Sequence, residues 1–338
     1  MLGYFVVCLF LIFILLVFLI LVRDFYFISY VFRKKSRKPA PDSWAVVTGS
    51  TDGIGLEFAR KFAKDGFNLC LISRRQTKLD VVRSNILAEF PQCPSIETVA
   101  FDFASTDYKV IEGKLKGFRK IDVLVNNVSV LPTEEPYPEY FVLNDDHHIR
   151  RTIQVNIMAC VKMTHLVLPT MERQGRGLVV NIASIFGLKP VPLFALYGST
   201  KRFMDVFARS IKQECQSKEV SIRSLVAGLV RTNLAPFKKN IFVPDARKYV
   251  ESAYNMVMFR NRSTGYWSHQ LLYQVLLLFS SLSLLGNTFD TSLFKFLADY
   301  RDAVYSKRLE KFPHESSSDV ETDFISWSFQ KMGIFKLS

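Results

Sequence analysis

The sequence predicts an α/β domain built on one doubly wound parallel sheet, with helices on both faces. Short apolar runs alternate regularly with longer amphipathic segments from about residue 44 to about residue 231. The first of these runs leads directly into a glycine-rich turn. Regular alternation of strand and helix implies βαβ units with right-handed crossovers, so the strands run in one direction and the sheet is buried on both faces.

Six buried strands are expected, because each apolar run is short and bounded by polar or turn residues. They lie at residues 44–48, 67–72, 96–101, 121–125, 178–182 and 220–226. Helical patterns fill the intervals, without internal repeats or low-complexity segments. We therefore predict a single catalytic domain over residues 44–270.

The N-terminal segment is too apolar to belong to that domain. Of the 338 residues, 49% are hydrophobic, and residues 1–22 contain no charged side chain. About 20 apolar residues suffice to span a hydrocarbon core of about 30 Å. A cleaved signal peptide fits less well, because the segment has no basic start and no small-residue cleavage site. We predict a transmembrane anchor at residues 1–22.

The chain has a net charge of +13, and its densest basic cluster lies beside this anchor, in a linker at residues 23–43. The basic residues of that linker's cluster are Arg33, Lys34, Lys35, Arg37 and Lys38. By the positive-inside rule the linker and the domain face the cytosol. A nucleic-acid-binding protein is disfavoured, because the charge is not interleaved with aromatic residues. The five cysteines are widely spaced, which predicts reduced thiols and no metal site.

The chain after residue 231 is harder to interpret. A second apolar segment at residues 271–286 is short for a span and contains serines, so an interfacial element, a buried helix and a full span all stay open. The aromatic-rich residues 237–259 fit a lipid tunnel or ordinary core equally well. Residues 287–338 are charged, which predicts a loosely ordered polar tail in the cytosol.

A phosphate-binding loop follows the first strand and opens a helix. Glycines let the backbone approach a pyrophosphate closely, and the helix N-terminus attracts the anion. With a strand before it and another strand after the helix, the loop predicts a Rossmann-type dinucleotide site. Its residues are Gly49, Ser50, Thr51, Asp52, Gly53, Ile54 and Gly55.

The end of the second strand selects the cofactor. An acidic residue there bonds the ribose hydroxyls of NAD(H), whereas a basic residue accommodates the 2′-phosphate of NADP(H). This strand ends in Ser73, Arg74 and Arg75, and no carboxylate follows before Asp80. We expect NADP(H), with Arg74 as the phosphate contact and Ser73 as a supporting donor.

Three further residues predict the chemistry. Ser184 follows the fifth strand, and Tyr197 and Lys201 lie one turn apart on one face of the next helix. A nearby ammonium can favour the phenolate of the tyrosine, which then serves as general acid or base, while Ser184 bonds the carbonyl oxygen. This arrangement predicts interconversion of a ketone and a secondary alcohol.

In order and spacing, these motifs resemble the short-chain dehydrogenase/reductase family. The resemblance rests on the loop at residues 48–55, the Asn126–Asn127 pair, Asn156, Ser184, and Tyr197 with Lys201. It implies that Asn156 completes a catalytic tetrad by holding a water in a proton relay, and that Lys201 also bonds the nicotinamide ribose. It further implies an adenine contact from Asp102 and cofactor contacts from Asn127 and Thr232.

Two residues depart from the family pattern, since Ser129 and Ala227 replace the usual glycine and proline. The wider layout, including residues 264–269, is similar to the membrane-bound 17-beta-hydroxysteroid dehydrogenase and very-long-chain 3-oxoacyl-CoA reductase branch. That likeness implies an endoplasmic reticulum membrane and a hydrophobic ketone, either a steroid or an acyl-CoA. The alternative is a catalytically silent nucleotide-binding scaffold at the membrane, and a homodimer is left open.

Overall fold

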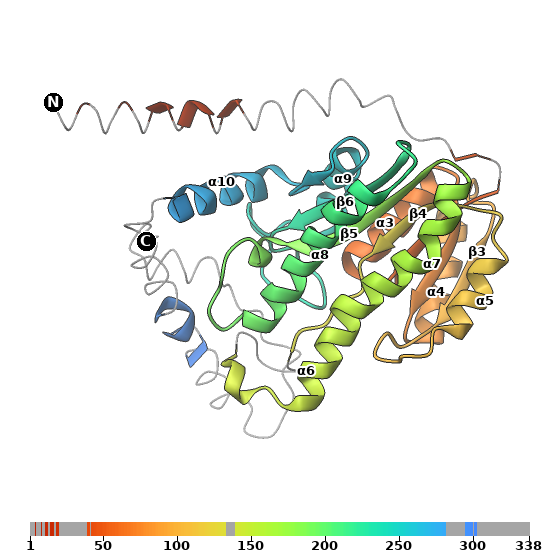
Figure 1. Cartoon of the computed structure of the whole chain (residues 1–338), viewed down its shortest axis with the longest axis horizontal. Coiled ribbons are helices and arrows are strands. Elements are labelled where there is room, and N and C mark those ends of the chain that lie inside the picture. Colours follow the sequence, from red (N-terminus) through yellow and green to blue (C-terminus); the bar gives the residue numbers. More distant parts are fainter. Residues whose placement is uncertain are drawn as a thin grey trace.

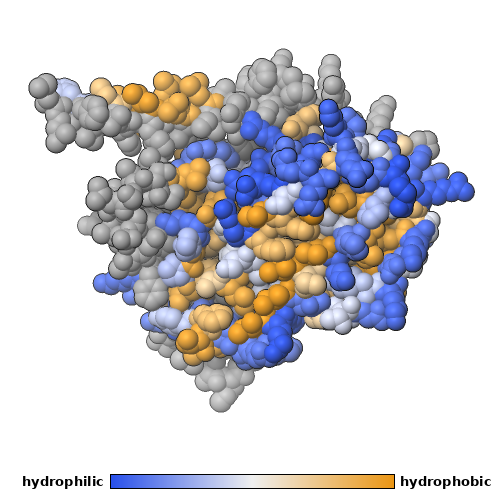
Figure 2. All heavy atoms as spheres, in the orientation of Figure 1, coloured by the Kyte–Doolittle hydropathy of each residue, from blue (hydrophilic) through white to orange (hydrophobic). Residues whose placement is uncertain are grey.

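The computed structural model of this chain describes residues 42–132 and 139–281, the positions 295–299 and 301–302, and scattered positions before residue 41 (4, 8, 11, 12, 14–16, 18, 19, 39 and 40). Most of the predicted anchor and linker therefore lies outside the described residues, as does the tail beyond residue 302. The described positions of the anchor are helical and exposed, and their surface is largely apolar in Figure 2.

A seven-stranded sheet forms the centre of the domain, and all of its strand pairs are parallel. The strand order is β3-β2-β1-β4-β5-β6-β7. The strands are β1 (Ser43–Thr48), β2 (Asn68–Ser73), β3 (Ile96–Ala100), β4 (Lys120–Asn126), β5 (Gly177–Ser184), β6 (Val220–Ala227) and β7 (Arg262–Ser263). The predicted doubly wound α/β domain and its six strands are confirmed, and the two-residue strand β7 adds an edge that no hydrophobic pattern indicated.

Helices pack on both faces of this sheet (Figure 1). They are α3 (Gly53–Lys64), α4 (Gln76–Glu89), α5 (Lys109–Lys116), α6 (Asp146–Ile153), α7 (Ala159–Arg173), α8 (Ala195–Glu214), α9 (Ala246–Val257) and α10 (Trp267–Ser281). Short turns of other helix types occur at η2 (Phe141–Leu143), η3 (Gln154–Met158) and η4 (Ile185–Gly187).

The sheet has a separate apolar core on each face. In β1, Ala45 and Val47 pack into the core that α3, α4 and α9 cover, whereas Val46 packs into the core beneath α5 and α7. This alternation follows from the two-residue period of a strand. Each fully buried valine contributes roughly 1.5–3 kcal/mol of hydrophobic stabilisation, so these runs hold the strand in one register.

Two aromatic residues of the 237–259 region belong to the core. Tyr249 and Tyr254 on α9 are buried, and Tyr254 packs edge-on against Phe62 with ring centroids 5.4 Å apart. Their hydroxyls are satisfied, since Tyr249 donates to the carbonyl of Thr264 at 3.0 Å and Tyr254 to Asp65 at 2.5 Å. The aromatic residues of α9 are therefore ordinary core residues and do not line a lipid tunnel.

The second apolar segment forms the greater part of helix α10. This helix begins at Trp267, so the expected domain boundary at residue 270 falls inside it. Ser268 and His269 in its first turn are completely buried, whereas residues 271–276 are half-buried. Among the helices that the structure describes, none combines the length and apolar composition needed to cross a membrane.

Part of the predicted tail packs against the domain. Residues 295–299 are helical, and Leu297 is buried against Leu193 and Phe194. Arg301 forms an ion pair with Glu139, so the charge of the largely buried Arg301 guanidinium is neutralised. The expectation of a loosely ordered polar tail is wrong for this stretch, because its apolar and charged side chains both have partners in the domain.

Candidate active site

A cleft of about 350 Å³ lies at the carboxyl ends of the strands, around the point where the strand order reverses. Strand β1 has β2 on one side and β4 on the other, and the chain leaves β1 towards β3 before it returns to β4. Loops after such neighbouring strands diverge and leave a crevice between them, which is where doubly wound folds bind ligands.

Most of the predicted site residues line this cleft. They are Gly49, Thr51, Asp52, Gly53, Ile54, Ser73, Arg74, Asn127, Ser184, Tyr197, Lys201 and Thr232. Four predicted residues are not in its lining, namely Ser50, Gly55, Asp102 and Asn156. The Asp102 carboxylate caps its own turn by accepting from the Ala104 amide at 3.0 Å, and Ser50 is completely buried.

The glycines of the loop are required by its backbone and its packing. Gly49 and Gly53 have φ angles of +63° and +54°, which side chains disfavour. A Cβ at Gly55 would lie 2.4 Å from both the Gly49 carbonyl oxygen and the Asn127 side-chain nitrogen. Gly55 thus allows α3 to approach the loop closely, which explains why it is needed although it does not line the cleft.

The first turn of α3 is suited to bind an anion. Asp52 precedes the helix, but its side chain makes no capping bond and accepts instead from the Asn233 amide at 3.1 Å. Amides at a helix N-terminus that lack a side-chain cap, together with the helix dipole, attract phosphate. The loop therefore fits the pyrophosphate of a dinucleotide.

Asn127 holds this loop in place. Its side-chain nitrogen donates to the carbonyls of Thr48 and Gly49 at 3.0 Å each, and its backbone amide donates to the Thr48 hydroxyl at 3.0 Å. Three bonds join the end of β4 to the end of β1. Asn127 lines the cleft as predicted, and its hydrogen bonds hold the glycine-rich loop in position.

One end of the cleft is cationic. Arg74, Arg75 and Lys78 line it, and Asp52 is the one carboxylate in the described lining. Ser73 and Thr51 share a hydrogen bond of 2.9 Å between their hydroxyls, which fixes the rim. Sequence reasoning missed Lys78, although it follows Arg74 by about one helical turn and could have been found by that spacing. The charge suits a ribose that carries a phosphate.

The other end of the cleft brings Ser184, Tyr197 and Lys201 together. The hydroxyls of Ser184 and Tyr197 are hydrogen-bonded to each other. The Lys201 ammonium donates to the carbonyl of Ile182 at 2.9 Å and lies 5.6 Å from the centre of the Tyr197 ring. Lys201 is 3% exposed and Ser184 is 7% exposed, whereas Tyr197 is partly exposed to the cleft.

Burial sets the protonation of Tyr197 and Lys201. It raises the pKa of Tyr197 to about 12, against the smaller lowering effect of the Ser184 hydrogen bond. It lowers the pKa of Lys201 to about 8, because the buried ammonium loses its hydration. The protein alone therefore keeps Tyr197 as a neutral phenol, which can donate a proton, whereas the expected shift towards phenolate is not produced by these residues alone.

Asn156 acts on the site through its neighbours. It lies in the π-helical turn η3, where its oxygen accepts from the Val130 amide at 2.8 Å and the Ser129 hydroxyl at 3.1 Å. Its nitrogen donates to the Val130 carbonyl at 3.0 Å and to the Thr200 hydroxyl at 3.1 Å. Thr200 in turn donates to the Tyr197 carbonyl at 2.8 Å, so Asn156 connects the loop after β4 to the catalytic helix.

Comparison with known proteins decides which family this geometry represents. Residues 43–240, more than half of the chain, match the sequence model described as short chain dehydrogenase. The chain belongs to the short-chain dehydrogenase family. The members of this family are oxidoreductases, so this chain is an enzyme of that class, and the cleft is its candidate active site.

The chain is also similar to curated proteins over most of its length. It is 42% identical to the very-long-chain 3-oxoacyl-CoA reductase of Homo sapiens over 238 residues, 69% of this chain and 74% of that protein. It is 40% identical to very-long-chain 3-oxoacyl-CoA reductase-B of Danio rerio over 233 residues, 68% of this chain and 73% of that protein.

Two solved structures share the fold. One is a short-chain dehydrogenase from Sphingobium yanoikuyae in complex with NADPH, with a TM-score of 0.57, 24% identity, and coverage of 63% of this chain and 83% of that chain. The other is an alcohol dehydrogenase from the archaeon Thermococcus sibiricus complexed with 5-hydroxy-NADP, with a TM-score of 0.57, 22% identity, and coverage of 65% and 92%. Both support the doubly wound architecture.

Of the two departures from the short-chain dehydrogenase pattern, Ser129 makes a side-chain hydrogen bond and Ala227 is buried in the core. Ser129 replaces a glycine and contributes the hydroxyl that bonds Asn156. Beside Ala227, the amide of Gly228 donates to Nδ1 of His269 at 3.1 Å, and Nε2 of that ring lies 3.1 Å from the carbonyls of Leu229 and Phe242. Burial lowers the pKa of His269 to about 4, so its ring is neutral. The hydrogen bonds of this neutral ring connect α10 to the loop after β6.

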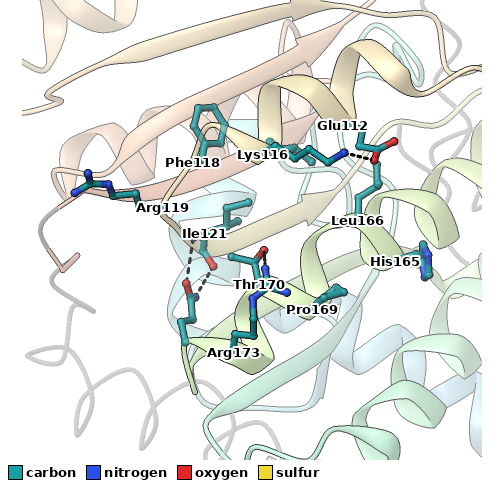
Figure 3. A pocket seen from close by; sticks show the side chains of 12 residues that line it. Glu112, Lys116, Phe118, Arg119, Ile121, His165, Leu166, Pro169, Thr170 and Arg173 are labelled. Carbon is teal, nitrogen blue, oxygen red and sulfur yellow. Dashed lines mark hydrogen bonds and ion pairs between the residues drawn. The ribbon is translucent and has the colours of Figure 1, made fainter.

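A second hollow lies near the amino end of the central strand β4, between α5 and α7 (Figure 3). It is bounded by α5, the start of β4 and the end of α7, and its side chains include Arg119, His165 and Arg173. None of the predicted site residues lines it. Elsewhere, Asp145, His147 and His148 lie close together on the surface, but Asp145 caps α6 by accepting from the His148 amide at 2.7 Å.

Proposed function

We propose that this enzyme reduces the keto group of a long-chain 3-oxoacyl-CoA, with NADPH as its cofactor. The observation that carries the proposal is that Ser184, Tyr197 and Lys201 meet at one end of a cleft whose other end is cationic. The names of the similar curated proteins support 3-oxoacyl-CoA over a steroid as the substrate.

The catalytic residues have distinct tasks in this proposal. The hydroxyls of Ser184 and Tyr197 donate hydrogen bonds to the keto oxygen, where negative charge develops. NADPH bound in the cleft would supply the hydride that the carbonyl carbon accepts. Tyr197 transfers its proton to the oxygen, which yields the secondary alcohol, and the nearby Lys201 ammonium stabilises the phenolate that remains. Asn156 holds the surrounding backbone through Val130 and Thr200.

The preference for NADPH rests on the cationic end of the cleft. Arg74, Arg75 and Lys78 outnumber Asp52 there, and a guanidinium binds a phosphate with two parallel hydrogen bonds. A carboxylate that would bond the ribose hydroxyls of NADH is not in the described lining at the end of β2.

We further propose that residues 1–22 anchor the enzyme in the endoplasmic reticulum membrane, with the catalytic domain in the cytosol. The uncharged segment and the basic linker after it support this arrangement. The protein should resist alkaline extraction from microsomes, and protease added outside intact microsomes should digest the domain. Extraction of the intact chain, or protection of the domain, would contradict the proposal.

The catalytic proposal is tested by NADPH oxidation with detergent-solubilised full-length protein. 3-Oxopalmitoyl-CoA should be reduced, and a 17-ketosteroid or NADH should give much slower turnover. If the steroid were reduced and 3-oxopalmitoyl-CoA were not, the substrate would be a steroid and not a 3-oxoacyl-CoA. Tight NADPH binding without turnover of either ketone would favour the silent scaffold. Light scattering on the same preparation tests for a homodimer.

A further inference from the structure

A single loop runs along one side of the cleft. Residues 228–235 follow β6, and we name them the β6 loop. All of them except Arg231 line the cleft. The loop starts beside the catalytic end, because Ala227, the last residue of β6, is paired with Ser184 in the sheet. The first residues of the β6 loop are thus next to the proposed site of reduction.

The far end of the β6 loop rests on the phosphate-binding loop. The Asn233 amide donates to the Asp52 carboxylate at 3.1 Å. A Cβ at Gly53 would lie 2.7 Å from the methyl carbon of Thr232. The β6 loop therefore connects the two ends of the cleft, so a shift of this loop would change the shape of the cleft along its length.

Helix α10 lies at the β6 side of the sheet (Figure 1), and His269 in its first turn holds the starting end of the β6 loop. The Gly228 amide donates to Nδ1 of the neutral ring at 3.1 Å, so the ring proton is on Nε2. The carbonyl oxygens of Leu229 and Phe242, each 3.1 Å from Nε2, share this N–H. His269 has 0% exposure, so water does not replace these hydrogen bonds.

The imidazole and the β6 loop are in close contact. A Cβ added at Gly228 would lie 2.6 Å from Cδ2 of His269, and the three atoms nearest to that Cβ all belong to the imidazole. The imidazole also packs against Tyr249 and Tyr266, with ring centroids 5.5 and 5.4 Å away. Both tyrosines are buried. The ring is therefore confined, and its nitrogens stay directed at the backbone of the loop.

We propose that His269 is a positioning residue for the cofactor, because it holds the β6 loop in the conformation that binds the nicotinamide half of NADPH. The inference rests on the proposed function, since hydride transfer requires the nicotinamide at the end of the cleft that Ser184 and Tyr197 line. The ribose with the 2′-phosphate is expected at the other end, around Arg74. The two halves of the cofactor therefore report separately on the two ends of the cleft.

His269→Leu removes both ring nitrogens and keeps a side chain of similar size. We expect the dissociation constant of NADPH for the full-length protein to rise about tenfold, because three backbone groups lose their partner. The dissociation constant of 2′,5′-ADP, which carries the 2′-phosphate but lacks the nicotinamide half, should stay within about twofold of wild type. Fluorescence titration measures the binding of NADPH, and calorimetry measures that of 2′,5′-ADP.

His269→Gln is the conservative variant. Its amide has an oxygen acceptor and N–H donors, which are the same kinds of group as in the neutral imidazole. It should bring the dissociation constant of NADPH back to within about threefold of the wild-type value. If the glutamine variant binds NADPH as weakly as the leucine variant, the hydrogen bonds of His269 do not position the loop.

Gln270→Leu is the matched control, because Gln270 is the next residue of α10, is 8% exposed and accepts from the Thr264 hydroxyl at 3.0 Å. Thr264 is not among the described residues that line the cleft. This variant should lower thermal stability and bind both nucleotides like wild type. Equal losses of NADPH affinity in His269→Leu and Gln270→Leu, no loss in either, or an equal loss of 2′,5′-ADP affinity in His269→Leu would reject the positioning role.

The close contact at Gly228 gives a second test. Gly228→Ala should weaken NADPH binding, because its methyl group would meet the imidazole of His269. His269→Ala removes the imidazole, so the double variant should bind NADPH no more weakly than His269→Ala alone. Additive losses in the double variant would show that the two residues act separately, and the inference would be wrong.

Failure of this inference is distinguishable from failure of the proposed function. If wild type binds NADPH but reduces no 3-oxoacyl-CoA, the proposed substrate is wrong, and the binding measurements still decide the role of His269. If wild type reduces 3-oxopalmitoyl-CoA and His269→Leu keeps the wild-type affinity for NADPH, the proposed function stands and the role of His269 is overturned. If wild type does not bind NADPH, both are wrong.

Discussion

Both ends of the cleft contain cationic side chains, but those at one end are exposed and the one at the other end is buried. At one end Arg74, Arg75 and Lys78 are on an open rim, and at the other Lys201 is 3% exposed among apolar and backbone groups. Exposed cations attract a phosphate but are screened by salt and keep their hydration. A buried ammonium loses hydration, and the pKa of Lys201 falls to about 8 as a result.

We therefore expect the exposed cations to affect cofactor binding and the residues at the buried end to affect the chemical step. Substitution of an exposed cation at the rim should lower the affinity for the cofactor by an amount that depends on ionic strength. Water and salt ions can partly compensate for the lost charge there. The buried ammonium of Lys201 has no such replacement, since it is only 3% exposed. The four predictions below test this separation, in order of decreasing effect.

Tyr197→Phe removes the proton donor and leaves the ring. Turnover of any accepted ketone should fall by about a thousandfold, the usual worth of a positioned general acid. The dissociation constant of NADPH, measured by fluorescence titration, should stay within about twofold of wild type. Full turnover with Phe at this position would refute the mechanism.

The buried lysine makes stability depend on pH. Folding lowers the pKa of Lys201 from 10.5 to about 8. Below pH 8 both states bind the proton and the folded state carries the whole desolvation penalty, at most about 3 kcal/mol. Between about pH 8 and 10.5 the unfolded chain binds a proton that the folded protein has released, so the free energy of unfolding rises with pH.

Denaturant unfolding of wild type and Lys201→Met across this range measures the effect. Cysteines and Tyr197 have raised pKa values and act in the opposite direction above pH 9, but both proteins contain them. The wild-type value minus the variant value should therefore increase from pH 8 to 10. A difference that does not vary with pH would show that Lys201 keeps its ordinary pKa.

Arg74→Gln tests the exposed end. Loss of one charge-assisted hydrogen bond should raise KM for NADPH roughly tenfold and leave KM for NADH unchanged. Added salt should weaken NADPH binding to wild type more than to the variant. Arg83→Gln on the exposed surface of α4 is the control and should match wild type. An equal loss for both cofactors would remove Arg74 from phosphate recognition.

Ser129→Gly restores the residue usual in the family and should have the smallest effect. Asn156 loses one partner but keeps the Val130 amide at 2.8 Å. We expect a loss of about 1 kcal/mol in the free energy of unfolding, and turnover within about twofold of wild type. A large loss of turnover would mean that the serine hydroxyl takes part in catalysis.

Some features of the site could be predicted because they depend on residues close together in the chain. The glycine loop is such a case, since a strand, a turn and a helix follow one another within residues 43–64. Tyr197 and Lys201 share a helix face for the same reason. Ser184 was placed at the end of a strand, and parallel strands bring their carboxyl ends to one edge.

Other features could not be predicted from local patterns. Asn156 was assigned to the active site by resemblance, but only the packed structure shows that its side chain bonds Val130 and Thr200. Strand β7 has two residues and no hydrophobic period to detect. His269 lies in an apolar helix, and its three backbone partners belong to segments 27 to 41 positions away.

The sequence by itself determined the doubly wound sheet and located the glycine loop, Arg74 and the candidate catalytic groups on it, because hydrophobic period and turn chemistry are local properties. The tertiary structure decided how those groups are protonated and what surrounds them. Burial raises the pKa of Tyr197 and lowers that of Lys201, and Arg301 meets Glu139 across 162 positions of sequence. Desolvation and long-range contact depend on the whole packed chain, so no short stretch of sequence encodes them.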